Sequence, residues 1–305
     1  MLWANFCAQK KTYMIGYHRK KDADDNFINK DNQDFALIPD DKKYWYADPI
    51  LFEHNGKAYI FCEAYNKKTQ KGELGYFVIN DDGSHSKIQI IMANKEYHYS
   101  FPNVFQHNDS ICMIPETQDQ GVIYIYKAIE FPNKWEIEKI LLDDGHYADS
   151  TLLKNDDNLY LITSEVYAPK DVLTTTMKIF EVAEDRCIFE ETGRENTRLA
   201  GPVIKYKDML IKPTQKCVNS YGEATILSEL KSVEPYKEEY IKTILPDAIN
   251  VGNAYSIGGT HTWGMSEHYE VVDVWYFKNV FDMKTSVKFI KHVIKSRIHK
   301  LFGNR

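Results

Sequence analysis

The chain has 305 residues, of which 43% are hydrophobic and 27% are charged. This composition excludes a disordered or fibrous chain, and no stretch approaches the roughly 20 apolar residues that span a membrane. The net charge of −6 is unevenly distributed, because residues 283–305 hold seven basic residues and no acidic one, which leaves −13 for residues 1–282. The acidic body argues against nucleic-acid binding, which requires basic surface to neutralise phosphates.

The cysteines and the start of the sequence indicate a cellular location. Five cysteines without a C-x-x-C pair suggest neither a disulfide framework nor a zinc site, so a reducing compartment is expected. Residues 1–8 form too short an apolar run for a signal peptide. We therefore expect a cytoplasmic protein.

The first part of the chain contains a strong hairpin signal. Residues 13–17 read as a strand, and a polar loop follows over residues 18–33. Residues 46–63 then read as two strands joined at Asn55-Gly56, a sequence that favours a tight two-residue turn. Asp48 opens the first strand and Glu63 closes the second, so both carboxylates should lie together at the end opposite the turn.

The same arrangement recurs four more times with variations. Equivalent positions are separated by 53, 48, 52 and 59 residues, which leaves room for about four short strands in each copy. These positions are Asp48, Phe101, Asp149, Gly201 and Thr260. The repeat predicts an all-β fold: a single five-bladed β-propeller over residues 1–282, with these strands innermost and the N-terminal strand closing the ring. A two-sheet sandwich is the alternative.

Residues 283–305 differ from the rest of the chain. Their apolar residues follow a spacing of three to four, with lysines between them, which predicts a C-terminal amphipathic α-helix with a basic face. This helix would either pack on the outside of the propeller or attach to an anionic membrane surface through residues 284–305. The second interpretation predicts a peripheral protein at the inner membrane of a bacterial cell.

Acidic residues are expected to gather at one rim of the propeller, where the innermost strands begin. Carboxylates that share a partly dry pocket raise one another's pKa, and sugar chemistry uses one carboxylate as a base and another as an acid. We predict Asp48, Asp149 and Glu116 as catalytic residues. The structural alternative is that an aspartate before proline starts a strand by accepting backbone hydrogen bonds, and that strand-end glutamates are satisfied by neighbouring amides.

Further polar residues recur near the same rim and are predicted to bind a sugar or sugar-phosphate ligand. They are Glu63, His98, His146, Glu165, Arg198, Lys212, Gln215 and His261. No contiguous loop indicates a metal site and no cofactor is predicted, although the acidic rim could accept Ca²⁺ through oxygen ligands. A nucleotide-sugar donor is compatible with this set of side chains.

Three short motifs resemble those of family 43 glycoside hydrolases, which are five-bladed propellers. The motifs are Ala47-Asp48-Pro49, Ala148-Asp149-Ser150 and Ala200-Gly201-Pro202. The resemblance implies that Asp48 is a general base and that Asp149 tunes pKa values and orients the substrate. Ala200 stands where the resemblance places the acidic glutamate, so Glu116 or Glu165 would have to supply the proton.

A second resemblance covers roughly residues 35–275. The order of Asp48-Pro49 with Glu63, residues 98–102 with Ile114-Pro115-Glu116, residues 212–215, and His261-Thr262 is similar to the N-terminal propeller of glucosamine inositolphosphorylceramide transferases. The separate transferase domain of those plant proteins has no counterpart in this sequence. The leading hypothesis is a glycosyltransferase-type protein of cell-surface glycan or glycolipid assembly. The alternatives are a hydrolase with a displaced acid and a non-catalytic glycan-binding propeller.

Overall fold

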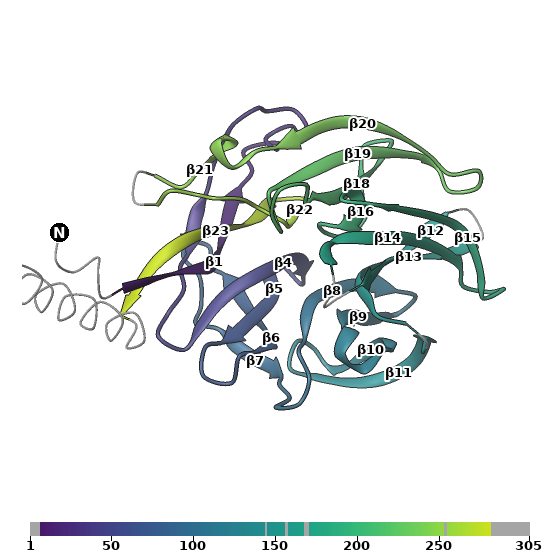
Figure 1. Cartoon of the computed structure of the whole chain (residues 1–305), viewed down its shortest axis with the longest axis horizontal. Helices are drawn as coiled ribbons and strands as arrows, with labels where there is room; N and C mark the ends of the chain where they lie inside the picture. The colour runs from purple at the N-terminus through teal and green to yellow at the C-terminus, as the bar shows by residue number, and fades with distance from the viewer. Residues whose placement is uncertain (1–6, 144, 156–157, 168–170, 253–254, 282–305) are drawn as a thin grey trace, which may run out of the picture.

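Five antiparallel sheets surround a common centre in this computed structural model (Figure 1), which describes residues 7–143, 145–155, 158–167, 171–252 and 255–281. The prediction of an all-β five-bladed propeller is confirmed, and the sandwich alternative is wrong. Two short 3₁₀ turns, Gln118–Gln120 and Pro246–Ala248, are the helical elements of the described residues. No helix within these ranges is long and apolar enough to cross a membrane.

The first four blades each run from the centre outward in sequence order. Blade 1 contains β4 (Tyr44–His54), β5 (Lys57–Asn66), β6 (Lys71–Ile79) and β7 (Gln89–Met92). Blade 2 contains β8 (Ser100–His107), β9 (Ser110–Glu116), β10 (Ile123–Glu130) and β11 (Lys134–Leu142). Blade 3 contains β12 (Tyr147–Asn155), β13 (Asn158–Tyr167), β14 (Asp171–Glu181) and β15 (Arg186–Gly193). Blade 4 contains β16 (Glu195–Leu199), β18 (Met209–Lys216), β19 (Ala224–Ser232) and β20 (Lys237–Ile244), with β17 (Ile204–Tyr206) beside β18.

The fifth blade joins the two ends of the propeller. Its strands are β22 (Trp263–Met265), β23 (Tyr269–Phe281), β1 (Cys7–Arg19) and β3 (Ala36–Ile38). β1 and β23 pair antiparallel over 13 residues, from Cys7 opposite Phe281 to Arg19 opposite Tyr269. The prediction that the N-terminal strand closes the ring is confirmed. A small parallel pair, β2 (Gln33–Asp34) with β21 (Ile249–Asn250), lies outside the blades.

The hairpin of blade 1 forms as its sequence predicts. Asn55 and Gly56 both have positive φ, 50° and 72°, which is the geometry that asparagine-glycine favours in a two-residue turn. Bulky side chains from adjacent blades then pack against one another; Phe61, Phe101 and Met113 are among the largest fully buried ones. This burial of apolar surface is the main force that holds neighbouring blades together.

A repeated bulge sets the direction of the residues at the centre. The pairing register shifts at Asp48 in β4, at Phe101 in β8 and at Asp149 in β12, and these three residues have φ values of 51°, 44° and 48°. A bulge adds one residue to a strand and re-aims its side chain. In blades 1 to 3 the recurring sequence positions therefore mark the same backbone bulge.

The predicted C-terminal helix and the domain division at residue 283 lie outside the described residues.

Candidate active site

A cavity of about 180 Å³ opens at the end of the channel where the innermost strands begin. Blades 1, 2, 4 and 5, together with the loop after β18, supply its walls. The lining residues are Tyr13, Trp45, Ala47, Asp48, Glu63, His98, Ser100, Glu116, Arg198, Tyr221 and His261. Six of the eleven predicted site residues therefore meet in one cavity, as the hairpin repeat led us to expect.

Asp48 lies at the base of this cavity with little exposed surface. Its Oδ1 accepts a hydrogen bond from the Thr262 hydroxyl at 3.1 Å and lies 3.3 Å from His261 Nε2, and its Oδ2 accepts from the Phe101 amide at 3.2 Å. Burial raises the pKa of Asp48 to about 7, although the neighbouring His261 opposes the rise. This carboxyl group can therefore gain or lose a proton near neutral pH.

Asp273 of β23 holds Asp48 and His261 in place from below. Its carboxylate accepts hydrogen bonds from the amides of Asp48, His261 and Thr262 at 3.2, 2.9 and 3.0 Å. His261 Nδ1 lies 2.6 Å from the same carboxylate. Burial works to raise the pKa of Asp273, but His261 and these amides outweigh it and the pKa is lowered. The same ion pair raises the pKa of His261 against the effect of burial, so a charged pair lies under Asp48.

Glu116 and Asp149 share one arginine. Arg198 donates from Nη2 to Glu116 at 3.3 Å and from Nε to Asp149 at 2.5 Å. Burial and the Asp149 charge raise the pKa of Glu116 to about 8, so this carboxyl group is mostly protonated at pH 7. Asp149 also accepts from Gln215 at 3.1 Å and lies behind Arg198 rather than on the cavity wall.

Glu63 and His98 form another part of the cavity wall. His98 Nε2 lies 3.2 Å from Glu63 Oε1, and the Gly72 amide donates to His98 Nδ1 at 3.0 Å. Burial opposes protonation of His98, but the Glu63 carboxylate outweighs burial and raises the pKa to about 9. The Gly72 bond needs a free lone pair on Nδ1, which favours the neutral ring with its proton on Nε2 facing Glu63. The Gly72 contact therefore opposes the protonation that the Glu63 carboxylate favours, because a proton on Nδ1 would face the Gly72 N–H.

Aromatic side chains enclose the cavity and contact one another. Trp45 stacks on Tyr65 with ring centres 4.3 Å apart, and its ring centre lies 5.1 Å from that of Tyr13 at a tilt of 39°. Tyr221 packs edge-on against His261 and lies under the Arg198 guanidinium, 5.2 Å from each. These rings exclude water from the carboxylates, which contributes to the raised pKa values.

The structure places Glu165, Lys212 and His146 outside the cavity. In blades 1 and 2 the glutamate follows the bulged residue by 15 positions, whereas Glu165 follows Asp149 by 16. Since side chains alternate along a strand, this one additional residue turns Glu165 away from the cavity, toward Lys178 Nζ at 2.8 Å. Ser164 occupies the equivalent inward position and is fully buried.

Lys212 is fully buried inside blade 4, with its amine 2.6 Å from Glu238 and from the Tyr236 hydroxyl. These contacts do not fit the predicted substrate-binding role, because the amine cannot reach the cavity. His146 is exposed before β12 and donates to the Gln118 carbonyl at 3.3 Å, so it too lies apart from the cavity.

Asp48, His261 and Asp273 are close enough together to be considered as cation ligands. One potential ligand atom from each lies within 4.8 Å of the others. However, the Asp273 oxygens already face three amide N–H groups and the imidazole, and Asp48 faces a further amide and a hydroxyl. A cation there would have to displace hydrogen-bond donors that point at the same oxygens, so this set does not fit Ca²⁺ as it is arranged.

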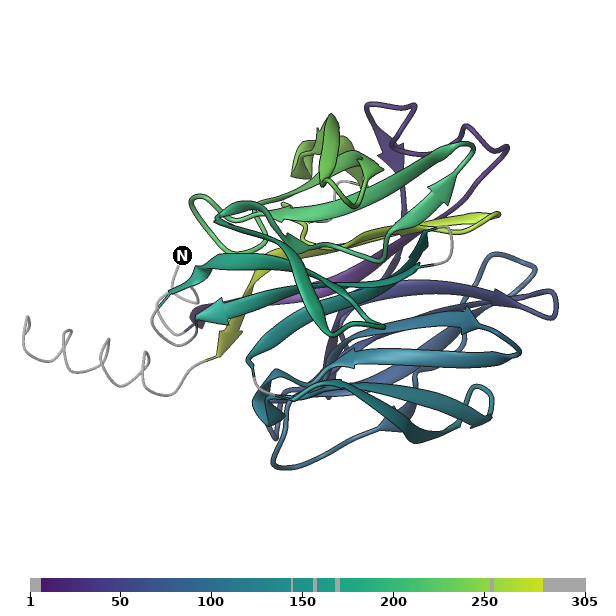
Figure 2. The same cartoon turned by 90° about the vertical axis from the view of Figure 1, so that its right-hand side faces the viewer.

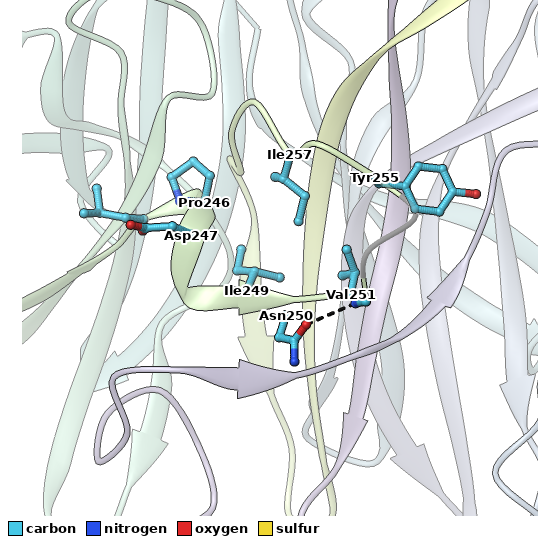
Figure 3. Close-up of a pocket in the computed structure, with 9 residues that line it drawn as sticks. Pro246, Asp247, Ile249, Asn250, Val251, Tyr255 and Ile257 are labelled. Atoms are coloured by element: carbon cyan, nitrogen blue, oxygen red, sulfur yellow. Dashed lines mark hydrogen bonds between the residues drawn. The ribbon is translucent and has the colours of Figure 1, made fainter.

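A larger hollow of about 580 Å³ lies between β20 and β23 (Figure 3). Its lining is mostly apolar, and Asp247 is the carboxylate among the lining residues. The Gly252 amide donates to Asn250 Oδ1 at 3.1 Å in the loop that borders the hollow. It offers no group of opposed acids and bases, so the chemistry is better placed in the smaller central cavity.

Sequence analysis did not select Asp273, Tyr13 or Tyr221 for the site. Tyr13 lies in a regular strand, where nothing marks it as different from a core residue. Asp273 is a lone carboxylate between Val272 and Val274, a pattern that indicates a buried, paired charge without naming its partner. The positions of Tyr13 and Asp273 near Asp48 result from closure of the ring by β1 and β23, a contact between the two ends of the chain. For Tyr221, the Tyr-Gly pair at residues 221–222 is a visible signal, but it also fits an ordinary turn.

A protein-family comparison gives a match over most of the chain. The family model described as glucosamine inositolphosphorylceramide transferase 1, N-terminal, matches residues 40–274. The chain is 26% identical to glucosamine inositolphosphorylceramide transferase 1 of Arabidopsis thaliana over 237 residues and of Oryza sativa subsp. japonica over 233. Each match covers 73% of this chain and 30% of the plant protein, so the chain spans less than a third of those relatives.

Solved structures with the same architecture act on sugars. The chain is similar to the catalytic domain of Coprinopsis cinerea GH62 α-L-arabinofuranosidase, with a TM-score of 0.57, 10% identity, and coverage of 80% of this chain and 96% of that one. It is also similar to a GH43 β-xylosidase/α-arabinofuranosidase from a compost metagenome in complex with xylotriose (TM-score 0.51, 9% identity, 78% and 91% coverage). At these identities the likeness shows the fold alone.

Proposed function

Because the chain belongs to the family of the glucosamine inositolphosphorylceramide transferase 1 N-terminal domain, we propose that it is a carbohydrate-active propeller of glycosyltransferase type. We place its role in cell-surface glycan or glycolipid assembly. The observation that carries the proposal is that Asp48 and Glu116, with pKa values of about 7 and about 8, line one cavity. Two carboxyl groups with pKa values at and just above neutrality suit acid–base chemistry at a glycosidic centre.

In the proposed reaction Asp48 acts as the base. Its carboxylate accepts the proton of the acceptor hydroxyl while that oxygen forms a bond to the anomeric carbon. Glu116 donates its proton to the leaving oxygen as the bond to the anomeric carbon breaks, so the two proton transfers balance. Asp149 is a positioning residue in this scheme, because it acts through Arg198 rather than on the cavity wall.

The cavity also suggests what binds there. A volume of about 180 Å³ is below the about 300–1,000 Å³ of pockets for drug-sized ligands, which favours a single sugar residue. Glu63 and Asp48 can accept hydrogen bonds from sugar hydroxyls. Arg198 and the rim residue Lys11 carry positive charge next to the cavity, which would suit the phosphate of a nucleotide-sugar donor.

Hydrolysis is the second candidate reaction, and one observation favours it. Glu116 supplies, in the same cavity as Asp48, the acid that Ala200 cannot supply. Water would then replace the acceptor hydroxyl. Xylotriose in the compost-metagenome structure shows only that a related architecture accepts such a ligand.

The basic segment 284–305 bears on where in the cell the protein acts. We assign to it a contact with anionic membrane surface at the cytoplasmic side, supported by its seven basic residues in the absence of any acidic one.

The test uses two single variants on a panel of nucleotide-sugars and aryl glycosides. Asp48→Asn and Glu116→Gln should each lower kcat by at least about 100-fold, because each removes a general acid or base. Glu165→Gln, outside the cavity, is the matched control and should keep activity. Sugar binding by the natural chain, together with an absence of turnover on every substrate, would support the non-catalytic alternative. Activity that survives both substitutions would refute the proposed roles.

A further inference from the structure

Lys11 differs from the other cationic side chains at the cavity because no carboxylate pairs with it. The side chains of Arg198, His98 and His261 each lie against a carboxylate described above. Within the part of the chain that the structure describes, Lys11 makes no ion pair, and its amine donates one hydrogen bond, to the Tyr221 carbonyl at 2.7 Å. A protonated lysine has three N–H donors, so two of them are available to a ligand.

The register of β1 places this amine beside the cavity. Lys11 and Tyr13 lie two positions apart in a strand that pairs without a register shift, so their side chains extend from the same face, and Tyr13 lines the cavity. Lys11 is the nearer of the two to the start of β1, which pairs with the end of β23. In Figure 2 these two strand ends lie together at the left, opposite the β4–β5 turn. Lys11 therefore lies at the cavity end of blade 5, one step beyond the Tyr13 side chain.

Aromatic rings surround the amine and separate it from water. Nζ of Lys11 lies 4.1 Å from the ring centre of Trp275, 5.3 Å from that of Tyr13 and 5.5 Å from that of Tyr221. Burial lowers the pKa of Lys11 to about 8, although the charge of Asp273 opposes the shift, so the amine is still mostly protonated at pH 7. A partly desolvated charge without a counter-ion gains more from an anionic ligand than a paired charge does.

Two tyrosine hydroxyls supply further donors at the same place. Tyr13 and Tyr221 line the cavity with ring centres 5.1 and 5.2 Å from that of His261, and neither hydroxyl makes a hydrogen bond to another described residue. Burial raises the pKa of both phenols well above the ordinary range, so both stay protonated and can donate. The Arg198 guanidinium lies 5.2 Å from the Tyr221 ring that Lys11 also contacts, which adds a second positive charge nearby. An amine and two hydroxyls next to a guanidinium are suited to bind a phosphoryl group.

We propose that Lys11, Tyr13 and Tyr221 form the subsite for the phosphoryl group linked to the anomeric oxygen of a donor sugar, and that Lys11 selects donors with this charge. The inference rests on the glycosyl transfer proposed above and adds the class of leaving group. In a cavity that holds one sugar, a group linked to that sugar has to lie at the edge of the cavity. In the transfer, the bond between the anomeric carbon and the phosphate oxygen breaks, that oxygen keeps the electron pair, and Glu116 supplies its proton. The three donors stabilise the phosphate as it leaves.

Titration calorimetry of the full chain with inorganic pyrophosphate tests the subsite without turnover. We expect the natural chain to bind, and Lys11→Met to bind at least about tenfold more weakly, because one charged contact is lost. Lys11→Arg keeps the charge and should keep most of the affinity. Tyr13→Phe and Tyr221→Phe each remove one hydroxyl and should weaken binding by about threefold or more. Lys10→Met, at an exposed position on the opposite face of β1, is the matched control and should bind as the natural chain does. A thermal melt of each variant shows that it is folded.

Three further ligands identify what the subsite accepts. Binding of uridine diphosphate or of farnesyl pyrophosphate that is lost in Lys11→Met would support the proposal, and the tighter of the two would show whether the donor is a nucleotide or a lipid. Binding of glucuronate that depends on Lys11, without binding of pyrophosphate, would overturn the proposal in favour of an acidic sugar.

The outcomes separate this subsite from the proposed function. Pyrophosphate affinity that is equal in the natural chain and Lys11→Met, or no binding by the natural chain, would overturn the subsite and leave the roles of Asp48 and Glu116 untouched. Loss of pyrophosphate binding in Lys11→Met, together with sugar turnover that survives Asp48→Asn and Glu116→Gln, would support the subsite and refute the proposed catalysis.

Discussion

Replacement of Asp273 by asparagine should destabilise the propeller and disorder the site. The Asp273 carboxylate is fully buried and accepts three amide hydrogen bonds and the contact from His261 Nδ1. An asparagine has one carbonyl oxygen for these four donors, and its amide N–H groups would face N–H groups. Two donors would therefore lose their acceptor.

The magnitude follows from these contacts. A buried donor without an acceptor costs about 1–3 kcal/mol, and removal of one partner of a buried ion pair costs about 3–5 kcal/mol. These effects overlap at one residue, so we expect a loss of about 3–5 kcal/mol in the free energy of unfolding. That is a large part of the about 5–15 kcal/mol that stabilises a typical domain.

Urea unfolding followed by tryptophan fluorescence measures the loss. Asp208→Asn, at an exposed position, is the matched control and should change the midpoint little. Where Asp273→Asn stays folded, Asp48 should no longer be fixed by its amide bond, and kcat should fall while sugar affinity changes less. A variant with unchanged stability and activity would refute the role given to Asp273.

Three further predictions test other parts of the structure. The raised pKa values of Asp48 and Glu116 mean that the folded chain keeps protons that the unfolded chain has lost above about pH 4.5, so stability should fall as pH rises from about 5 to 8. Glu116→Gln removes one of these groups, so the loss of unfolding free energy between pH 5 and 8, measured by urea unfolding, should be smaller by on the order of a few kcal/mol. Glu165→Gln is the control and should show the same loss as the natural chain. An equal pH dependence of stability in the natural chain and both variants would contradict the raised pKa of Glu116. Gly72→Ala should weaken sugar binding measured by titration calorimetry, since its Cβ would overlap the Tyr99 carbonyl and lie 2.8 Å from Glu63 Oε1. Gly193→Ala is the control, because the nearest atom to its Cβ is 3.3 Å away, and it should change the affinity little. Equal affinities of the two variants would show that the wall around His98 is free to adjust. Lys212→Met should lower the free energy of unfolding by about 2–4 kcal/mol, because it removes the ion pair with Glu238, yet it should leave sugar affinity unchanged. Lys205→Met, at an exposed position, is the control and should change neither quantity. A large loss of sugar affinity in folded Lys212→Met would show that Lys212 is a binding residue after all.

The predictable part of this protein is the part written in short stretches of sequence. Asn55-Gly56 fixes a turn by its own backbone preference, and the recurrence of such hairpins at intervals near 50 residues leads to five blades. Asp48, Glu63 and Glu116 could be placed together for the same reason, because each lies at a fixed offset within a hairpin.

Register decided the failures within single blades. Glu165 follows its bulged residue by 16 positions instead of 15, and one residue along a strand reverses the direction of a side chain. Lys212 and Gln215 lie three positions apart in β18 and therefore point to opposite faces, one toward Tyr236 and one toward Asp149.

By itself, the sequence determined the fold, its repeat and the acidic character of the rim, since turn chemistry and strand periodicity act over a few residues. Only the tertiary structure decided which polar groups meet at the centre. Asp273 reaches Asp48 across the closure of the ring, 225 positions apart in the chain, and Arg198 reaches Glu116 from 82 positions away. Such contacts depend on how blades pack, and the raised pKa values depend in turn on the water that this packing excludes.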